Sequence, residues 1–430
     1  MAQRKSFLAF TAALSLLGGL MSAQAPAQAA DPVTINIASF GEVIQKDMIA
    51  AYKKLHPEVT INVSVSTMDG LAQQLTTWCL SRKTPDIVAI EISYSGYYRE
   101  RSQCFQDLRE MNPSSSTIEN RFLDWRWDQG VAFNGNVIGI PTDVGGNAIA
   151  YRVDLFKKAG LPTDRNKVSA LWKTWDDFIE VGRKYKLKTK RAFMDNSGTL
   201  FNAVLNQGTA KYYRADGSLI HDTNPQVKTA FTVATKAMTT SFPAASKLPK
   251  DIGARIAPFT ADWIAGMKKD AFAAMLAPAW MMDYIKKNAP STRGKWDIAT
   301  IPGGGGNWGG SQLTIPVFSP KKQAAWEFIR WYLAPAQQMK VFKNHGLFPS
   351  TKNLYNTPAL TGYKDPFFNN APVGQIYTKS ALSLKPIVEG SKQRIIDQIF
   401  GQALSRVARG AQTPQAAWTQ TMADINKSVG

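Results

Sequence analysis

Apolar residues fall on alternate positions in two stretches near the start of the chain. One stretch covers 33–37 and the other covers 59–66, and a period of two predicts a strand for each. Between them, 42–56 carries apolar residues at helical spacing and ends before Pro57. A further helix is predicted from about Leu71, followed by the continuous apolar run 86–90, which is typical of a central strand covered on both faces. This order of strands and helices predicts an open α/β sheet.

Later segments also alternate between strand and helix patterns. Short strands are predicted at 137–141 and 148–151, and helices at 154–159, at 175–185 and after Ser319-Pro320, with Ser319 as the N-cap. About 400 residues remain after residue 30, too many for one ordinary core, so two lobes are expected.

The N-terminus predicts export. Arg4 and Lys5 precede an apolar run from 7 to 20, and small residues follow through Ala29 and Ala30. These features predict a signal peptide over 1–30 and a protein released into the periplasm. A membrane anchor or buried helix is the alternative, but the run is short and lacks a basic stop-transfer segment. No cysteine stands at the cleavage region, so no lipid anchor is expected.

Two cysteines, Cys79 and Cys104, are the only ones in the chain. In an oxidising compartment a disulfide between them would contribute about 3 kcal/mol. Two buried free thiols are the alternative.

Charge narrows the class of partner only a little. The formal net charge of +19 falls to +17 without Arg4 and Lys5, because 1–30 contains no acid. The densest basic cluster, 184–191, follows an amphipathic stretch, and the remaining basic residues are dispersed. A solvated surface is therefore favoured over a nucleic-acid patch, although an acidic sugar stays compatible with this charge.

Motifs for catalysis or metal binding are missing from the sequence. The histidines His56, His221 and His345 are isolated, without metal-ligand spacing, and no nucleophile elbow or zinc motif is present. Hence no enzyme, cofactor or metal site is predicted.

Aromatic residues stand instead among turn residues. Trp308 lies inside 301–311, a span with six glycines whose backbone can approach a ligand closely. Trp280 follows Pro278 after an apolar run. A sugar site needs aromatic faces with a few polar groups, so both residues are candidates, with a mobile loop and a core position as the alternatives.

Six segments, in order, resemble the bacterial extracellular solute-binding proteins of family 1, the family of maltose-binding protein. The segments are 34–41, 85–97, 139–162, 175–178, 275–280 and 316–333. The resemblance implies a type II periplasmic binding fold: two α/β lobes, each a mixed sheet flanked by helices, closing like a clam on a ligand between them. It also implies lobe one from 31–142 with a return segment at 298–334, and lobe two from 143–297 with C-terminal helices at 335–430.

Candidate ligand-binding residues follow from the same resemblance. In lobe one they are Phe40, Glu42, Asp69, Glu91, Ser93 and Tyr94. Asp143 at the crossing would accept hydrogen bonds from hydroxyls, Trp280 would stack on a sugar, and Trp308 would lie beside it with Gly309 and Gly310. Asn196 and Phe201 complete the set. Each has a structural alternative: Glu42 and Asp69 at helix starts, Tyr94 in the core and Phe201 packed.

The resemblance implies a monomeric receptor that captures a carbohydrate, an oligosaccharide in particular, for the permease of an ABC importer. The alternatives are the same fold binding an anionic or polyamine-type solute, and an exported polysaccharide-active enzyme.

Overall fold

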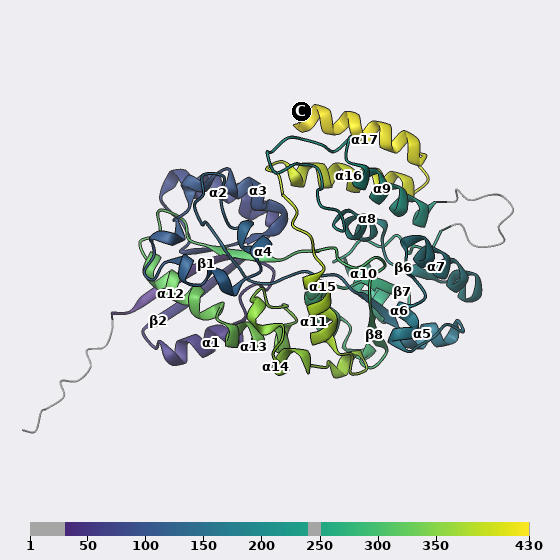
Figure 1. Cartoon of the computed structure of the whole chain (residues 1–430), viewed down its shortest axis with the longest axis horizontal. Helices are drawn as coiled ribbons and strands as arrows, with labels where there is room; N and C mark the ends of the chain where they lie inside the picture. The colour runs from purple at the N-terminus through teal and green to yellow at the C-terminus, as the bar shows by residue number, and fades with distance from the viewer. Residues whose placement is uncertain (1–30, 240–250, 430) are drawn as a thin grey trace, which may run out of the picture.

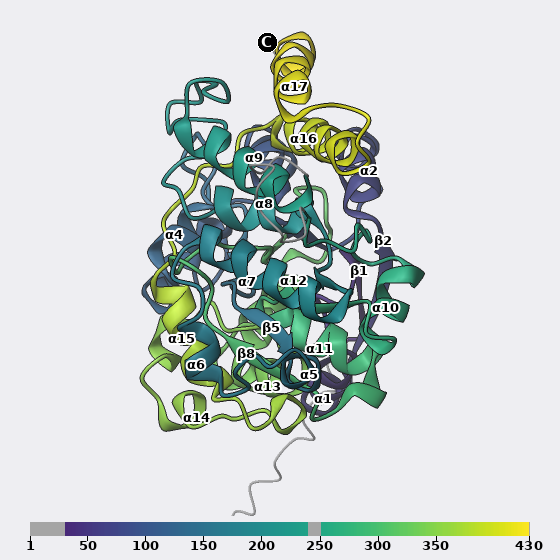
Figure 2. The ribbon, with the colours of Figure 1, turned by 90° about the vertical axis from the view of Figure 1, so that its right-hand side faces the viewer.

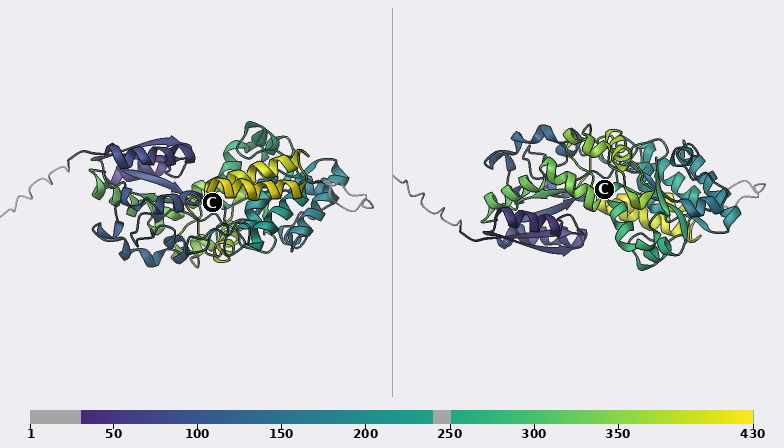
Figure 3. Two further views of the ribbon diagram at one scale, coloured as in Figure 1. Left: turned by 90° about the horizontal axis from the view of Figure 1, so that it is seen from above. Right: turned by 90° about the horizontal axis from the view of Figure 1, so that it is seen from below.

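The computed structural model describes residues 31–239 and 251–429, so the predicted signal peptide lies outside it. Two lobes stand side by side, one carrying the first strands of the chain and the other carrying the C-terminal helices (Figure 1). Views from above and below show the same two bodies joined at a waist (Figure 3). The predicted two-lobed α/β architecture is confirmed, with one mixed sheet in each lobe.

Lobe one is built on a five-stranded sheet of order β2-β1-β3-β9-β4. β1 is parallel to both β2 and β3, whereas β9 is antiparallel to β3 and β4. The strands are β1 (Val33–Phe40), β2 (Val59–Ser66), β3 (Ile87–Glu91), β4 (Ile140–Pro141) and β9 (Ser311–Thr314). The helices of this lobe are α1 (Lys46–Leu55), α2 (Met68–Ser81), α3 (Ser95–Arg99), α4 (Asp124–Asp128) and α12 (Lys322–Tyr332).

Lobe two has a four-stranded sheet of order β6-β7-β5-β8. Its strands are β5 (Ile149–Arg152), β6 (Ala192–Met194), β7 (Phe272–Leu276) and β8 (Trp296–Ala299). The helices before residue 300 are α5 (Val153–Lys158), α6 (Arg165–Ser169), α7 (Trp175–Thr189), α8 (Ser197–Leu205), α9 (Pro225–Met238), α10 (Ala261–Lys268) and α11 (Ala279–Asn288). α16 (Gln393–Ala408) and α17 (Pro414–Val429) then cover one end of this lobe (Figure 2).

Three further helices, α13 (Pro335–His345), α14 (Pro358–Thr361) and α15 (Val373–Leu382), follow α12. α13 packs against both α12 and α11, so it joins the two lobes. It ends at Gly346, whose φ of 72° is the left-handed cap expected after a helix.

Helix starts depart from the sequence-based expectation at two places. α1 begins at Lys46 rather than at Glu42, because 41–45 form a turn after β1. Ser319 is not an N-cap: its hydroxyl donates to Asp86 at 2.8 Å and accepts from the backbone N–H of Lys321, and α12 begins only at Lys322.

The chain passes between the lobes through adjacent backbone segments. The first crossing runs from β4 to β5, and the second returns from β8 to β9. The two are joined by backbone hydrogen bonds, from Asn147 to Gly306 at 3.0 Å and from Trp308 to Gly145 at 2.7 Å. The segment after α13 also joins them, since Val144 donates to Phe348 at 2.9 Å. These contacts define the hinge. β8 spans the boundary that the sequence placed between 297 and 298, and all four of its residues pair with β5.

The expected disulfide between Cys79 and Cys104 is present, with 5.1 Å between the Cα atoms. It ties the last turn of α2 to the segment after α3, entirely within lobe one. Across the described ranges, no helix is long and apolar enough to cross a bilayer.

Candidate functional site

A cavity of about 580 Å³ lies where the two lobes face one another, and we call it the cleft. The carboxyl ends of parallel strands β1 and β3 supply Phe40 and Glu91, because these ends meet at one edge of the sheet. α11 faces them from lobe two, and the hinge forms the floor. The lining residues are Phe40, Gly41, Glu42, Val43, Gln45, Met68, Glu91, Asp143, Phe259, Trp280, Asp283, Tyr284, Lys287, Asn288, Trp308, Gly309, Gly310, Ser311, His345 and Leu347.

Aromatic rings form the lobe-two wall of the cleft. Trp280 lies in the first turn of α11, and its ring meets that of Trp308 edge-on, with centroids 5.2 Å apart. The indole N–H of Trp280 donates to the main-chain oxygen of Trp308 at 2.8 Å, which fixes the glycine loop against the helix. Gly145 lies under this loop, where a Cβ atom would be only 2.1 Å from the Trp308 oxygen. Two partly buried indoles are thereby held next to the cleft.

Asp143 lies on the floor, at the start of the first crossing. Its Oδ1 accepts from the hydroxyl of Thr142 at 2.6 Å and from the backbone N–H of Ser311 at 2.9 Å. Within the described ranges no protein group donates to Oδ2, which leaves this oxygen for another donor. Burial raises the pKa of the Asp143 carboxyl, and the nearby guanidinium of Arg126 opposes that shift.

Arg126 holds the hinge together from beneath the floor. Its buried guanidinium donates to the carbonyl oxygens of Asp143 at 3.0 Å and Ser311 at 2.6 Å, and to the side chain of Gln129. Burial lowers the pKa of Arg126 to about 10, so the group keeps its positive charge at neutral pH. One side chain thus connects both crossings to α4.

Glu91 ends β3 at the opposite side of the floor. Its Oε2 accepts from both the backbone N–H and the hydroxyl of Ser93, the former at 2.8 Å. Burial raises the pKa of the Glu91 carboxyl, although Lys211 and Arg394 nearby act in the opposite direction. Glu91 and Asp143 therefore both line the cleft with carboxyl groups.

Lys287 on α11 is the one lysine that lines the cleft in the described structure, and two carboxylates neutralise it. It contacts Asp283 at 2.7 Å on its own helix and Glu42 across the cleft from lobe one. The charged lining is therefore acidic in sum, in contrast to the basic balance of the whole chain.

Eight of the predicted ligand-binding residues line the cleft. They are Phe40, Glu42, Glu91, Asp143, Trp280, Trp308, Gly309 and Gly310.

Of three others, Ser93 hydrogen-bonds to Glu91 within lobe one, whereas Asp69 and Tyr94 take part in a polar contact between the lobes. The phenol of Tyr94 donates to Asp69, and the guanidinium of Arg394 on α16 is 3.5 Å from the same carboxylate. Next to them, Lys211 pairs with Glu389 at 2.6 Å, both largely buried within lobe two. This group connects lobe one to α16.

Asn196 and Phe201 do not line the cleft. Asn196 is the N-cap of α8, where its Oδ1 accepts from the backbone N–H of Gly198 at 2.7 Å. Phe201 is buried in the core of lobe two and stacks on Phe400 at 4.9 Å. Capping and packing account for both positions in the structure.

Sequence reasoning missed most of the α11 side of the cleft. Asp283, Tyr284 and Lys287 follow Trp280 by three, four and seven positions, which places them on one helical face. Once Trp280 was a candidate, that spacing could have identified these three residues as cleft-lining. Phe259 had no comparable signal, because its position depends on the loop before α10.

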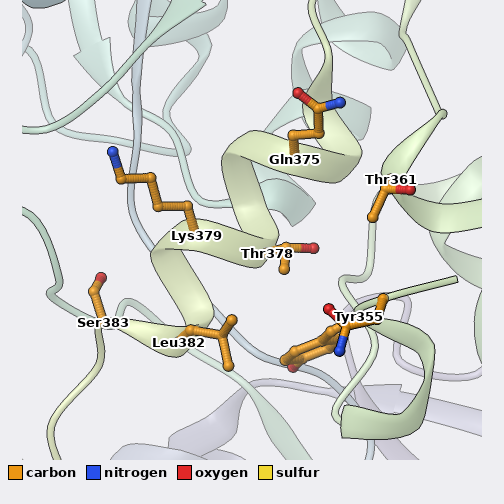
Figure 4. Close-up of a pocket in the computed structure, with 8 residues that line it drawn as sticks. Tyr355, Thr361, Gln375, Thr378, Lys379, Leu382 and Ser383 are labelled. Atoms are coloured by element: carbon orange, nitrogen blue, oxygen red, sulfur yellow. The ribbon is translucent and has the colours of Figure 1, made fainter. Parts of the chain in front are cut away.

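A second hollow lies away from the cleft, beside α15 (Figure 4). Thr378 and Leu382 point toward Tyr355, whereas Lys379 points away from it. The Tyr355 hydroxyl is already used, since it donates to the carbonyl oxygen of Pro349 at 2.8 Å. The lining is otherwise mostly polar, with Asn356, Thr361, Gln375 and Ser383 among its residues, and its described part has no pair of aromatic rings like that of the cleft. Among described residues, no group of three or more His, Cys, Asp or Glu could hold a metal ion.

Two hinged lobes with an aromatic and carboxylate-lined cleft between them define a solute-binding protein. Residues 35–339 match the family model described as "Bacterial extracellular solute-binding protein", and the chain belongs to this family. Members of this family bind solutes rather than transform them.

Similar proteins agree in fold. A crystal structure of an extracellular solute-binding protein of family 1 is 35% identical, with a TM-score of 0.80 over 93% of this chain and 100% of that chain. The structure of an ABC transporter associated binding protein from B. animalis subsp. lactis in complex with β-1,6-galactobiose is 23% identical. Its TM-score is 0.73, over 92% of this chain and 98% of that chain.

Curated relatives include two sugar-binding proteins. The lactose-binding protein of Rhizobium radiobacter is 27% identical over 68% of this chain and 67% of its own length. The arabinooligosaccharide-binding protein of Bacillus subtilis is 22% identical over 79% of this chain and 78% of its own length.

Proposed function

We propose that this protein captures a neutral oligosaccharide in the periplasm and delivers it to the permease of an ABC importer. The observation that carries the proposal is the division of the cleft into two faces. Trp280 and Trp308 offer apolar surface from lobe two, while Glu91 and Asp143 offer hydrogen-bond acceptors from the floor. A sugar has apolar C–H faces and a rim of hydroxyl donors, which match these two faces.

The charge of the cleft separates the candidate ligands. Of the groups lining it, Glu42, Glu91, Asp143 and Asp283 are acidic, and Lys287 is already paired with two of them. A phosphodiester or an acidic sugar would be repelled there, which argues against the anionic alternative. A polyamine would be attracted by the carboxylates and would make cation–π contacts with the indoles, so the relatives named as sugar-binding proteins, rather than the cleft alone, favour the saccharide.

Relatives support the sugar proposal. The region that matches this chain covers two thirds or more of the lactose-binding relative and of the arabinooligosaccharide-binding relative. The delivery step and the periplasmic location rest on the family and on the predicted signal peptide. We propose a monomer that acts without enzymatic turnover.

The direct test has two arms. Native mass spectrometry of freshly purified protein should reveal a retained saccharide. Calorimetry and thermal melting should then be run with lactose, β-1,6-galactobiose and arabinobiose, each with its monosaccharide. A ligand at 100 times its Kd should stabilise the folded protein by about 2.7 kcal/mol. No retained saccharide and no shift with any disaccharide would refute the proposal, as would release of new reducing ends.

Trp280 provides the first variant. Trp280→Ala should raise the Kd of the bound disaccharide about tenfold or more, because a stacking surface is removed from one face of the sugar. Trp331→Ala is the matched control, since Trp331 lies on α12 and packs against Phe328 and Tyr52 in lobe one. Equal Kd values for wild type and Trp280→Ala would refute the stacking role.

A further inference from the structure

Phe259 is an apolar side chain that the fold does not bury. It precedes α10, and 51% of its surface is exposed. It lines the cleft at the end of the aromatic wall. Single exposed apolar residues are common on protein surfaces, so what distinguishes Phe259 is that its exposed ring lies in the cleft beside two indoles.

The backbone at this residue is held in an uncommon conformation. Phe259 has a φ of 67°, in the left-handed region that a bulky side chain rarely adopts. Such a conformation costs about 1–3 kcal/mol and persists only when its surroundings impose it. Thr260 supplies the restraint: its hydroxyl donates to the carbonyl oxygen of Ala257 at 2.8 Å and caps α10 by accepting from Trp263 at 3.2 Å.

The ring itself is fixed on its inner side. It packs against Trp263 and Tyr284, with centroids 5.4 Å away in each case. Its distance from Trp280 is 6.1 Å with 25° between the ring planes, and from Trp308 it is 6.3 Å. The rings of Phe259, Trp280 and Trp308 thus make one continuous apolar surface in the cleft, wider than a single indole. Such a surface can contact two neighbouring sugar units.

We propose that Phe259 is a specificity-determining residue that contacts the second unit of a saccharide whose first unit lies against Trp280. This inference rests on the proposed function and adds that the cleft accommodates at least two sugar units. The left-handed backbone before α10 points the ring at the cleft, and its inner neighbours keep it there.

The test compares saccharides of different length. Phe259→Ala should raise the Kd of the disaccharide that the protein binds, lactose, β-1,6-galactobiose or arabinobiose, about tenfold. The Kd of the matching monosaccharide, galactose or arabinose, should stay the same. Phe259→Tyr should retain wild-type binding, because it keeps the ring. Phe133→Ala is the control: Phe133 is similarly exposed, at 56%, and does not line the cleft.

The backbone argument has its own readout. Phe259→Gly should melt at a higher temperature than Phe259→Ala, since glycine adopts positive φ without strain, and both should lose disaccharide affinity equally. Equal loss for monosaccharide and disaccharide, or no loss, would overturn the inference while leaving saccharide binding intact. Failure of the wild type to bind any disaccharide would instead refute the proposed function, and this inference with it.

Discussion

Asp143 is buried where the chain leaves the sheet of lobe one, and its two oxygens have different surroundings. Oδ1 is held by Thr142 and Ser311, and Oδ2 accepts from no described protein group. The raised pKa means that burial opposes ionisation of this carboxyl, so an ionised Asp143 costs folding free energy. A residue that lowers stability at the floor of a cleft fits a binding role.

Asp143→Asn should therefore separate stability from binding. Removing the buried charge should leave the melting temperature unchanged or higher, because the amide oxygen can still accept from Thr142 and Ser311. Saccharide binding should weaken about tenfold, since hydrogen bonds to a charged acceptor contribute about 1.5–3 kcal/mol. Melting curves and calorimetry measure both effects.

Asp195→Asn is the matched control. Asp195 is also buried, with a pKa raised to about 6 by burial, and it accepts from the indole N–H of Trp263 at 2.9 Å. It does not line the cleft, so the Kd of the saccharide should not change. A fall in affinity for Asp195→Asn as large as for Asp143→Asn would contradict the assignment of Asp143.

His221 makes stability depend on pH. Its imidazole is 3% exposed, and burial lowers its pKa below the ordinary 6.5. The folded state then binds fewer protons than the unfolded state below about pH 6.5, and stability falls as the pH falls further. The melting temperature of wild type should therefore drop between about pH 7.5 and about pH 5, and that drop should be smaller for His221→Gln. Identical drops would exclude His221 as the cause.

Individual site residues were predictable only where local context carried the signal. Trp280 and Trp308 stand among prolines and glycines, and both line the cleft. Phe201 shares its spacing with buried residues on α8, so sequence alone cannot separate cleft from core. Phe259 depends on a backbone angle that only the packing of α10 imposes.

At the scale of elements, the disulfide joins α2 to the segment after α3, and neither segment is part of the sheet of lobe one. Cys79 and Cys104 are 25 positions apart, and a loop of that size corresponds to about 3 kcal/mol in the chain-entropy treatment. The bond touches neither the hinge nor lobe two.

The double variant Cys79→Ser, Cys104→Ser should lower the free energy of unfolding by about 3 kcal/mol in urea titrations. The Kd of the saccharide should change little, because the bond lies outside the cleft. Adding a reductant should destabilise wild type and leave the double variant unchanged. A double variant as stable as wild type would contradict a stabilising role for the bond.

Element order was predictable because the apolar period changes from two to 3.6 along the chain, as β1, α1 and β2 show. The residues at which elements begin and end were less predictable. Lys46 rather than Glu42 begins α1, because the turn after β1 carries Glu42 to the cleft, a tertiary requirement that periodicity does not express.

At the scale of the whole molecule, the lobes contact one another tightly at one place beside the cleft. A Cβ atom at Gly96 of α3 would lie 2.3 Å from the carbonyl oxygen of Glu389 and 2.4 Å from the backbone of Gly390, which precede α16. Lobe one therefore meets lobe two through bare backbone here. No side chain fits between them.

Gly96→Ala should push the lobes apart at this contact. We expect a larger radius of gyration in X-ray scattering and a higher Kd for the saccharide, because the closed arrangement then costs more free energy. Gly401→Ala is the control, since a Cβ atom there meets nothing within 4 Å and the site lies on α16. Unchanged scattering and affinity for Gly96→Ala would show that the contact does not limit closure.

The two-lobed architecture was predictable from length and from the order of strands. The resemblance implied the two crossings, but the hydrogen bonds that join them were not predictable, because Arg126 and the crossings come from segments far apart in the chain. Hydrogen bonds between such distant segments leave no trace in local spacing.

The pairing of both cysteines also determines how the molecule can be labelled. Because the chain contains only these two cysteines and both are consumed by the bond, the oxidised protein offers no thiol to a maleimide dye. One cysteine introduced at an exposed position near the cleft would therefore be the single point of attachment. A fluorophore placed there would report on opening and closing of the lobes without competing sites, which makes the protein a direct starting point for a reagentless optical sensor of its own ligand.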